Sequence, residues 1–340
     1  MKKFLMLVLI MFLCSGCSSK NTRKVNILNW SSYIPSDVIL DFERETGISV
    51  NYGTYSSNEE LLAKLSVSKE GTYDLIFPSD YMVEIMINRG LIEEMDGSRL
   101  SNRDNLNPKF LNMDYDLGNR YTLPFIAAST VVAVNRENIS DEIDSYNDLL
   151  NPKYKNEIVL IDDQRIIIGM ALVANGYDMN SVNDYELKVA KEWLLKLKKN
   201  LKAYDSDSPK NFLISNEASI AVLWNAEGAL ASMENPNVEN IFPKEGVFLS
   251  VDNFAIPKGA KNKDELYEFI NYILREDVMK RIIESYPYKN VNLGTEKILN
   301  SEYLTNNAIN IPDYVFENGL FVANIGDNIS KYDRIWAEIK

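Results

Sequence analysis

Residues 29–35, with the sequence N-W-S-S-Y-I-P, join the first apolar segment of the chain to its first amphipathic segment. The apolar run at 25–28 just before it predicts a short buried strand. Pro35 followed by Ser36 predicts the start of a helix, with Ser36 as its N-cap residue. The stretch is therefore expected to be a strand-to-helix loop, the basic unit of an α/β fold.

Trp30, Ser31 and Tyr33 lie on this loop. In an open α/β sheet, such loops lie at the carboxyl edge of the strands, where ligands bind. Two aromatic rings and a hydroxyl group at that edge predict a flat-walled pocket with a hydrogen-bonding group. The alternative is that both rings only pack the loop onto the core. This stretch alone leaves the two interpretations open.

Outward from this loop, the hydrophobic pattern alternates between strand and helix. Strands are predicted at 48–52 and 75–77, and helices begin near Asn58, expected to be a capping residue, and near Asp80. Short loops between alternating strands and helices predict a parallel sheet with right-handed crossovers. A second series follows the β-rich segment 130–135, so the sequence predicts an α/β fold with two lobes and a ligand cleft between them.

The predicted organisation divides the chain into a leader, a tether and two discontinuous lobes. The segments are a signal peptide at 1–16, a tether at 17–23, a first lobe at 24–129 plus 251–296, and a second lobe at 130–250 plus 297–340.

The first segment has the pattern of a bacterial lipoprotein signal. Lys2 and Lys3 precede the apolar run 4–13, which is too short to span a bilayer, and the sequence C-S-G-C ends at Cys17. We expect lipid attachment at Cys17 and a periplasmic or cell-surface location on a membrane. The alternative is an uncleaved membrane anchor.

Composition excludes several classes of function. The chain has 340 residues, a formal net charge of −13 and no histidine. An acidic surface argues against nucleic acid as a partner, and the lack of histidine excludes Ser-His-Asp and Cys-His catalysis. Its only cysteines, Cys14 and Cys17, lie in the leader, so we expect no disulfide, no cysteine-based metal site and no cofactor in the folded body.

Several predicted loops carry aromatic residues beside acids, just past strand ends. Aromatic faces attract ammonium groups, and carboxylates accept charge-assisted hydrogen bonds from them. A slot of this kind suits an alkyl chain with positive ends, but it also suits a sugar, and any single tyrosine can be a core residue. The loops in question are 30–33, 79–81, 162–163 and 224–227.

The order of these segments resembles that of the periplasmic spermidine/putrescine-binding proteins, the ligand-capturing subunits of ATP-binding-cassette (ABC) importers. The resemblance covers nearly the whole chain from Val25 onward. It rests on N-W-S-S-Y-I-P, F-E-R-E-T-G-I-S-V, T-Y-S-S-N-E-E-L-L-A-K-L, Y-D-L-I-F-P-S-D-Y, L-I-D-D-Q-R, A-Y-D-S-D-S-P, W-N-A-E-G-A, F-P-K-E-G and D-N-F-A-I-P.

This resemblance implies a two-lobed fold, a polyamine ligand and a set of binding residues. Asp252 is expected to hold an amine, and Glu227 matches an acid of the putrescine-preferring members. For Asp162 the residues themselves favour a helix N-cap or first-turn acid over ligand contact. The implied binding residues are Trp30, Ser31, Tyr33, Ser79, Tyr81, Asp163, Ser206, Trp224, Glu227, Asp252 and Tyr286.

Four positions depart from the family pattern. Ile166 stands where spermidine binders carry an acid, Ser250 where they carry a tryptophan, and Val322 where a glutamine aligns loosely. Asp80 replaces a residue that is usually neutral and restores a charge. Putrescine and spermidine both remain candidate ligands, and the lost acid and aromatic surface favour the shorter diamine.

The leading hypothesis is thus a lipoprotein that binds a polyamine and delivers it to an ABC permease without catalysis. One rival is a binder of another solute, such as a sugar or an amino acid, on the same scaffold. For an amino acid we would expect an arginine in the cleft, and only Arg165 falls in the assigned segments. A second rival is a hydrolase that uses paired carboxylates. Asp162 and Asp163 are adjacent, so they are poorly placed to flank a bond.

Overall fold

The computed structural model describes residues 23–305, 309 and 311–340. The predicted leader, Cys17 and most of the predicted tether lie outside these residues. In the described part, no helix is long and apolar enough to cross a membrane.

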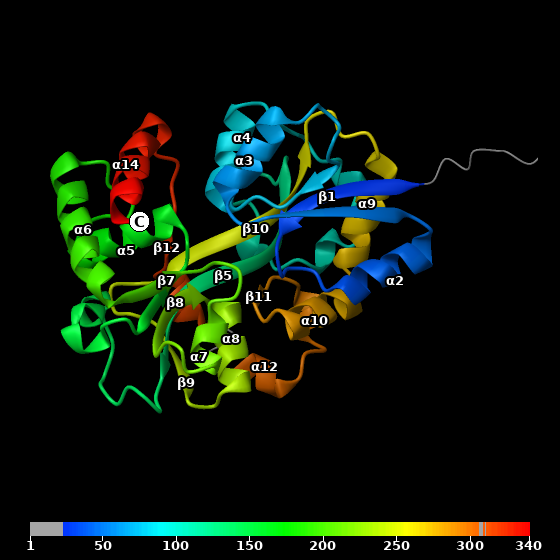
Figure 1. Ribbon diagram of the computed structural model, residues 1–340. Coiled ribbons are helices and arrows are strands. Elements are labelled where there is room, and N and C mark those ends of the chain that lie inside the picture. The colour runs from blue at the N-terminus through cyan, green and yellow to red at the C-terminus, as the bar shows by residue number, and fades with distance from the viewer. Residues whose placement is uncertain (1–22, 306–308, 310) are drawn as a thin grey trace, which may run out of the picture.

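The fold has two lobes joined by two long strands, β5 (Thr122–Asn135) and β10 (Phe248–Pro257), which run from one lobe into the other (Figure 1). One sheet path, β2-β1-β3-β10-β5-β8-β6-β7, passes through both lobes. The part of β5 up to Ser129 pairs with β10, and the part from Thr130 pairs with β8. Both long strands are buried along their whole length. The predicted α/β fold with two lobes is confirmed.

The first lobe is built around the parallel strands β2, β1 and β3, with β10 antiparallel beside β3. Its elements are β1 (Lys24–Trp30), α2 (Ser36–Thr46), β2 (Ser49–Tyr55), α3 (Asn58–Val67), β3 (Leu75–Ile76), α4 (Asp80–Asn88), β4 (Ile92–Glu93), α9 (Lys263–Ile273), α10 (Glu276–Ser285), β11 (Lys289–Asn290), α11 (Leu293–Glu296) and α12 (Ser301–Thr305).

The second lobe is built around β8, β6 and β7, which are parallel to one another. Its helices α5, α6 and α14 lie together at the end of the molecule away from β1 (Figure 1). Its elements and the C-terminal segments are β6 (Ile158–Leu160), α5 (Gln164–Ala174), α6 (Asp184–Leu197), β7 (Leu201–Tyr204), α7 (Lys210–Ile214), β8 (Ile220–Trp224), α8 (Asn225–Glu234), β9 (Val238–Ile241), α13 (Asp313–Glu317), β12 (Leu320–Phe321) and α14 (Ile329–Ile339).

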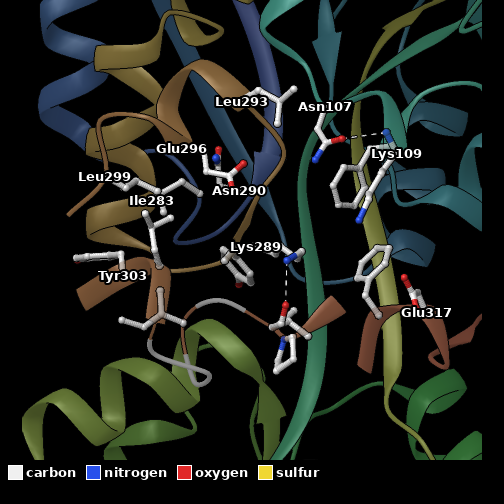
Figure 2. A pocket seen from close by; sticks show the side chains of 17 residues that line it. Asn107, Lys109, Ile283, Lys289, Asn290, Leu293, Glu296, Leu299, Tyr303 and Glu317 are labelled. Atoms are coloured by element: carbon white, nitrogen blue, oxygen red, sulfur yellow. Dashed lines mark hydrogen bonds between the residues drawn. The ribbon is translucent and has the colours of Figure 1, made fainter. Parts of the chain in front are cut away.

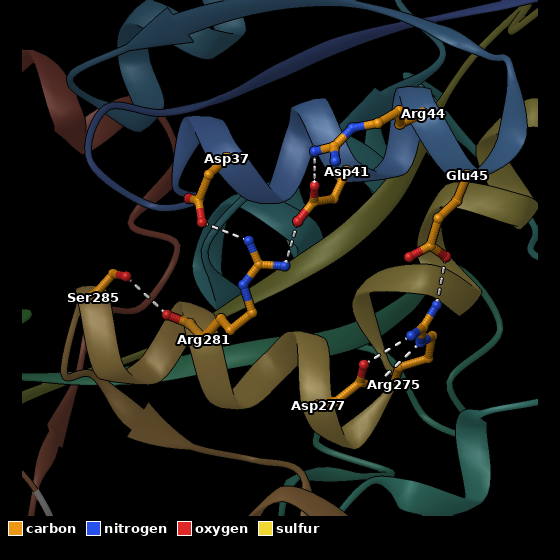
Figure 3. A network of polar contacts seen from close by, with 8 residues as sticks. All are labelled: Asp37, Asp41, Arg44, Glu45, Arg275, Asp277, Arg281 and Ser285. Carbon is orange, nitrogen blue, oxygen red and sulfur yellow. Dashed lines mark hydrogen bonds and ion pairs between the residues drawn. The ribbon is translucent and has the colours of Figure 1, made fainter.

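Ion pairs attach α10 to α2 across the surface of the first lobe (Figure 3). Arg281 on α10 binds both Asp37 and Asp41 on α2, and Arg275 binds Glu45. Beneath these pairs, Phe42 of α2 packs edge-on against the aromatic rings of α9. Exposed ion pairs contribute little each, so the buried aromatic contacts carry most of this attachment.

The predicted boundary between the lobes at residue 296 stays a prediction. Beyond it, the hydroxyl of Tyr303 on α12 donates to the backbone oxygen of Glu284 on α10 at 3.1 Å. Leu299 packs on the same apolar cluster of the first lobe. These contacts favour a first lobe that extends through α12.

Two predicted helix caps are wrong. The N-cap of α2 is Pro35, whose ψ of 141° is non-helical, so Ser36 is already inside the helix. The N-cap of α3 is Ser57, whose side chain accepts from the backbone N–H of Glu60, and not Asn58. Each helix therefore begins one residue earlier than predicted. Asn58 is left free to make a contact described below.

Candidate functional site

A cavity of about 70 Å³ lies between the lobes, next to the two connecting strands. Its lining includes the loop that follows β1, as the strand-to-helix pattern predicted, together with residues of strands and of helix starts. The lining residues are Trp30, Ser31, Tyr33, Ser56, Asn58, Ser79, Asp80, Tyr81, Ala128, Asp163, Arg165, Ile166, Ser206, Trp224, Leu249, Ser250, Asp252, Tyr288 and Val322.

Asp252 is the most heavily hydrogen-bonded acid of the cavity. It lies on β10 where the register with β5 shifts, and it is 2% exposed. The Tyr33 hydroxyl donates to its Oδ2 at 2.5 Å, and the Ser79 hydroxyl donates to its Oδ1 at 2.6 Å. Ser250 donates to Oδ1 at 3.2 Å. Burial raises the pKa of Asp252 to about 6, although these hydrogen bonds oppose the shift.

Asp80 is a second buried acid, at the start of α4 and 4% exposed. Its Oδ1 accepts from the backbone N–H of Tyr81 at 2.8 Å, and its Oδ2 accepts from that of Val251 at 3.3 Å. Burial, reinforced by repulsion from Asp252, raises the pKa of Asp80 to about 7. The first lobe therefore presents two neighbouring carboxyl groups that cannot both ionise easily in the empty cavity.

Aromatic rings are part of the cavity lining. Trp30 is fixed by a hydrogen bond from its indole N–H to the backbone oxygen of Phe77 at 2.9 Å. The ring of Tyr33 packs on that of Tyr288, with centroids 4.9 Å apart. Trp224 comes from the end of β8 in the second lobe. Trp30 and Tyr33 are thus held in place before any ligand arrives.

The second lobe contributes an acid, a base and a hydroxyl group. Asp163 is the N-cap of α5, accepting from the backbone N–H groups of Arg165 and Ile166. Burial raises the pKa of Asp163. Ser206 accepts from the backbone N–H of Asp162 at 2.8 Å. The prediction that Asp162 is a helix N-cap or first-turn acid is wrong. Asp163 is the N-cap of α5, so Asp162 lies just before the helix, where it binds the Lys340 ammonium at 2.5 Å.

Arg165 is the one arginine among the lining residues, and it is 3% exposed. Its Nη2 donates to Asn180 and to the backbone oxygen of Ala323, and its guanidinium lies over the Tyr332 ring. Its Nε has no hydrogen-bond partner among the described residues. The two Nη2 hydrogen bonds hold α5 to Asn180 and to the C-terminal segment.

Nine of the eleven predicted binding residues line the cavity. The exceptions are Glu227 and Tyr286. Glu227, in the first turn of α8, pairs with Lys210 at 3.9 Å outside the cavity. Tyr288 lines the cavity, and Tyr286 does not. The chain makes a tight turn at Pro287, in which the Tyr288 N–H donates to the Tyr286 oxygen, and this turn brings Tyr288 to the cavity.

Sequence reasoning did not assign Asn58, Arg165 and Tyr288 to the site. Asn58 donates from Nδ2 to the Ser79 hydroxyl at 3.0 Å and accepts from the Ser79 N–H at 3.2 Å. It thereby orients the hydroxyl that binds Asp252. Its position beside Ser57 made it resemble a cap, so no local signal identified this role.

A larger cavity of about 940 Å³ lies between α10, α11 and the segment around Ile311 (Figure 2). Lys109, Lys289 and Glu317 are on its walls, and the Lys289 ammonium donates to the backbone oxygen of Ile311 at 2.9 Å. It has none of the buried acids of the smaller cavity. In the part of the chain that the structure describes, no group of three or more acids, cysteines or histidines is placed to hold a metal ion.

Two lobes joined by paired strands, with a buried polar cavity between them, define the class of bacterial extracellular solute-binding proteins. The family model of that description matches residues 37–308. The chain belongs to this family, and within it to the group of the spermidine/putrescine-binding periplasmic proteins.

Three relatives carry this assignment. The spermidine/putrescine-binding periplasmic protein of Salmonella typhimurium is 37% identical over 96% of this chain and 94% of its own. The putrescine-binding periplasmic protein PotF of Escherichia coli is 31% identical over 97% and 95%. The solved structure of the Tp0655 (TpPotD) lipoprotein of Treponema pallidum has a TM-score of 0.83 and 25% identity, with 93% and 99% covered.

Proposed function

We propose that this chain is an extracytoplasmic lipoprotein that captures a polyamine between its lobes and delivers it to an ABC permease. The observation that carries the proposal is the charge of the cavity. Asp80, Asp163 and Asp252 line it, against the single base Arg165. A negative, aromatic and enclosed site suits a ligand with several ammonium groups.

Each lobe offers acids to one of the two ammonium groups of a diamine. Asp252 and Asp80 belong to the first lobe, and Asp163 belongs to the second. Near Asp163, Glu59 accepts from the Tyr81 hydroxyl at 3.1 Å, and repulsion between the two acids adds to the raised pKa of Glu59. A ligand with an ammonium at each end relieves the repulsion at both places, because each charge is then compensated.

The cavity is small, which favours putrescine over spermidine. Its volume of about 70 Å³ corresponds to about five to seven water-sized sites at 10–15 Å³ each. Ile166, Ser250 and Val322, the departures seen in the sequence, all line the cavity and supply no charge. Glu227 gives no support to this preference, since it lies outside the cavity. Putrescine has two ammonium groups to satisfy, whereas spermidine has a third amine within a longer chain.

Ligand capture requires the lobes to move, because the cavity is largely enclosed by residues from both. The paired strands β5 and β10 are the connection about which such a hinge motion takes place. A permease that recognises the closed form then distinguishes loaded from empty protein. We infer no catalysis, in keeping with membership of a solute-binding family.

The anchor is proposed at Cys17, outside the described residues. Its support is the sequence C-S-G-C after a short apolar run, together with the fact that the Treponema pallidum relative is a lipoprotein. The periplasmic relatives support an extracytoplasmic location. The tether 17–23 then links the lipid to β1.

The rival ligand with a specific observation behind it is an amino acid, because the free Nε of Arg165 could receive a carboxylate. A thermal-shift screen of the purified protein against polyamines, amino acids and sugars separates the two. We expect polyamines to raise the melting temperature, since ligand at 100 times its dissociation constant adds about 2.7 kcal/mol. A shift only with amino acids or only with sugars would overturn the proposal.

A further inference from the structure

Asp80 and Asp252 are neighbours on the same wall of the cavity. Ser79 and Asp252 face each other in an isolated β-bridge, and the carboxylate of the next residue, Asp80, accepts from the N–H of Val251. The two acids are therefore held side by side by backbone contacts. Rotation of either side chain away from the other would reduce their repulsion, but it would break the hydrogen bonds that hold the side chain.

Neither acid has a cationic partner in the described part of the chain. Asp80 receives two backbone N–H groups, and Asp252 receives the hydroxyls of Tyr33, Ser79 and Ser250. No lysine or arginine among the described residues forms an ion pair with either. Two buried ionised carboxylates without a cation are strongly unfavourable, so protonation of one of them is favoured when no ligand is bound.

The groups that face this pair come from several elements. Tyr33 follows β1, and Tyr115, whose hydroxyl donates to Asn253 at 3.1 Å, precedes β5. The proximity of Asp80 adds to the raised pKa of the Tyr115 phenol, which stays protonated. Arg165, across the cavity on α5, is the only base in the lining, and it acts on Glu59 and Asp163. Asp80 and Asp252 are thus the pair that holds the proton.

We propose that Asp80 and Asp252 together bind one ammonium group of the ligand, and that a proton held by this pair is released to solvent when the ammonium enters. This inference rests on the proposed polyamine binding. It adds Asp80 to the binding residues and the release of a proton to the binding reaction. The O–H bond of the protonated carboxyl breaks, the proton goes to the buffer, and the ammonium keeps its own protons. Asp80 is thereby a specificity-determining residue that selects cations over neutral solutes.

The sign of the pH dependence follows from this exchange. The ammonium binds the ionised pair, so affinity rises with pH between about 5 and 8 and then levels off. Because the pKa of Asp80 is raised to about 7, we expect about half a proton to be released per ligand at pH 7. The amines of the ligand stay protonated in this range and contribute no proton of their own.

The test is calorimetric titration of the purified protein with putrescine at pH 7, in buffers of different ionisation enthalpy. The slope of the observed heat against that enthalpy counts the protons released. We expect about half a proton for the natural chain, and less than about a tenth for Asp80→Asn. The same substitution should weaken putrescine binding by tenfold or more, since the ammonium loses one of its two carboxylates.

Glu84→Gln is the matched control, because it removes an exposed acid from the same helix, outside the cavity. It should leave affinity and proton release unchanged. If Asp80→Asn fails to fold, Asp80→Ser tests the role of Asp80 in binding, and titration of the natural chain still measures proton release. Putrescine binding without proton release, or equal binding by Asp80→Asn, would overturn this inference and leave the proposed function intact. No binding of any polyamine by the natural chain would instead overturn the proposed function.

Discussion

The hydrogen bonds on Asp252 determine what a substitution there will do. Tyr33 and Ser79 both donate to its carboxylate, from the loops that follow β1 and β3. Asn58 in turn orients Ser79. The acid is therefore held in one position before ligand binding, so little ordering is needed when an ammonium arrives.

Asp252→Asn should weaken putrescine binding by well over tenfold, because loss of a buried charge partner costs about 2–5 kcal/mol. The protein should stay folded, since the substitution also removes an uncompensated buried acid. Calorimetric titration and a melting curve measure the two effects. Ser250→Ala, which removes only a bond of 3.2 Å to Asp252, serves as a control with a small expected loss. An unchanged dissociation constant for Asp252→Asn would exclude this residue from the site.

The raised pKa values of Asp80 and Asp252 also predict how the stability of the empty protein depends on pH. An acid whose pKa is higher in the folded state contributes stability below its unfolded pKa and loses it as pH rises through the folded value. For these two acids the loss falls between about pH 4 and 7. Melting temperatures of the empty protein should decline over this range, and less so for Asp80→Asn. A flat profile for both would contradict the raised pKa values.

Helix α8 positions one wall of the cavity. It begins directly after Trp224, and the Asn225 side chain accepts from the N–H of Ser129 on β5 at 3.1 Å. Gly228 packs closely on the sheet: a Cβ there would lie 2.0 Å from Asn240 Oδ1 and 2.9 Å from Val131 Cγ2. The absence of a side chain is what allows α8 to approach β5 and β9.

Gly228→Ala should therefore push α8 away from the sheet, with a cost to folding of about 1–3 kcal/mol. Because Trp224 moves with the start of α8, putrescine binding should weaken as well. Melting curves and titration of the same preparation measure both effects. Gly53→Ala is the control, since its added Cβ meets nothing closer than 3.4 Å. Equal stability of the two variants would show that α8 has room to adjust.

The elements were largely predictable from the sequence, and their exact contacts were not. Alternation of apolar runs with helical patterns predicted both lobes, and the loop of Trp30 and Tyr33 reached the cavity as expected. Asn58 could not be assigned, because a polar residue at a helix start has the same local pattern whether it caps the helix or orients Ser79. Tyr288 could not be assigned, because the turn at Pro287 that brings it to the cavity depends on packing, which one-dimensional patterns do not contain.

The whole molecule combines an acidic cavity with a connection of two strands, and its binding residues are divided between the lobes. Asp80 and Asp252 lie on one side, and Asp163 and Trp224 on the other. A ligand that bridges the lobes stabilises the closed arrangement by its differential affinity for it. Delivery to a membrane permease further requires the protein to stay near the membrane.

Cys17→Ser tests that last requirement. Lipid attachment at Cys17 predicts that the substituted chain accumulates as an unprocessed precursor or is released from the membrane. Cell fractionation, with mass measurement of the recovered chain, distinguishes these outcomes from normal processing. The matched variant Cys14→Ser changes the other cysteine of the leader and should still give a lipid-bearing chain. Recovery of mature, lipid-bearing Cys17→Ser protein would place the attachment elsewhere.

The most direct test of polyamine capture is calorimetric titration of the purified protein with putrescine and, separately, with spermidine. We expect saturable binding of one putrescine per chain, at least as tight as that of spermidine, because the cavity is small and Ile166 supplies no charge in its lining. The double variant Asp80→Asn/Asp252→Asn should abolish the signal. Spermidine binding tenfold tighter than putrescine would contradict the predicted preference, and absence of binding by either amine would contradict the account itself.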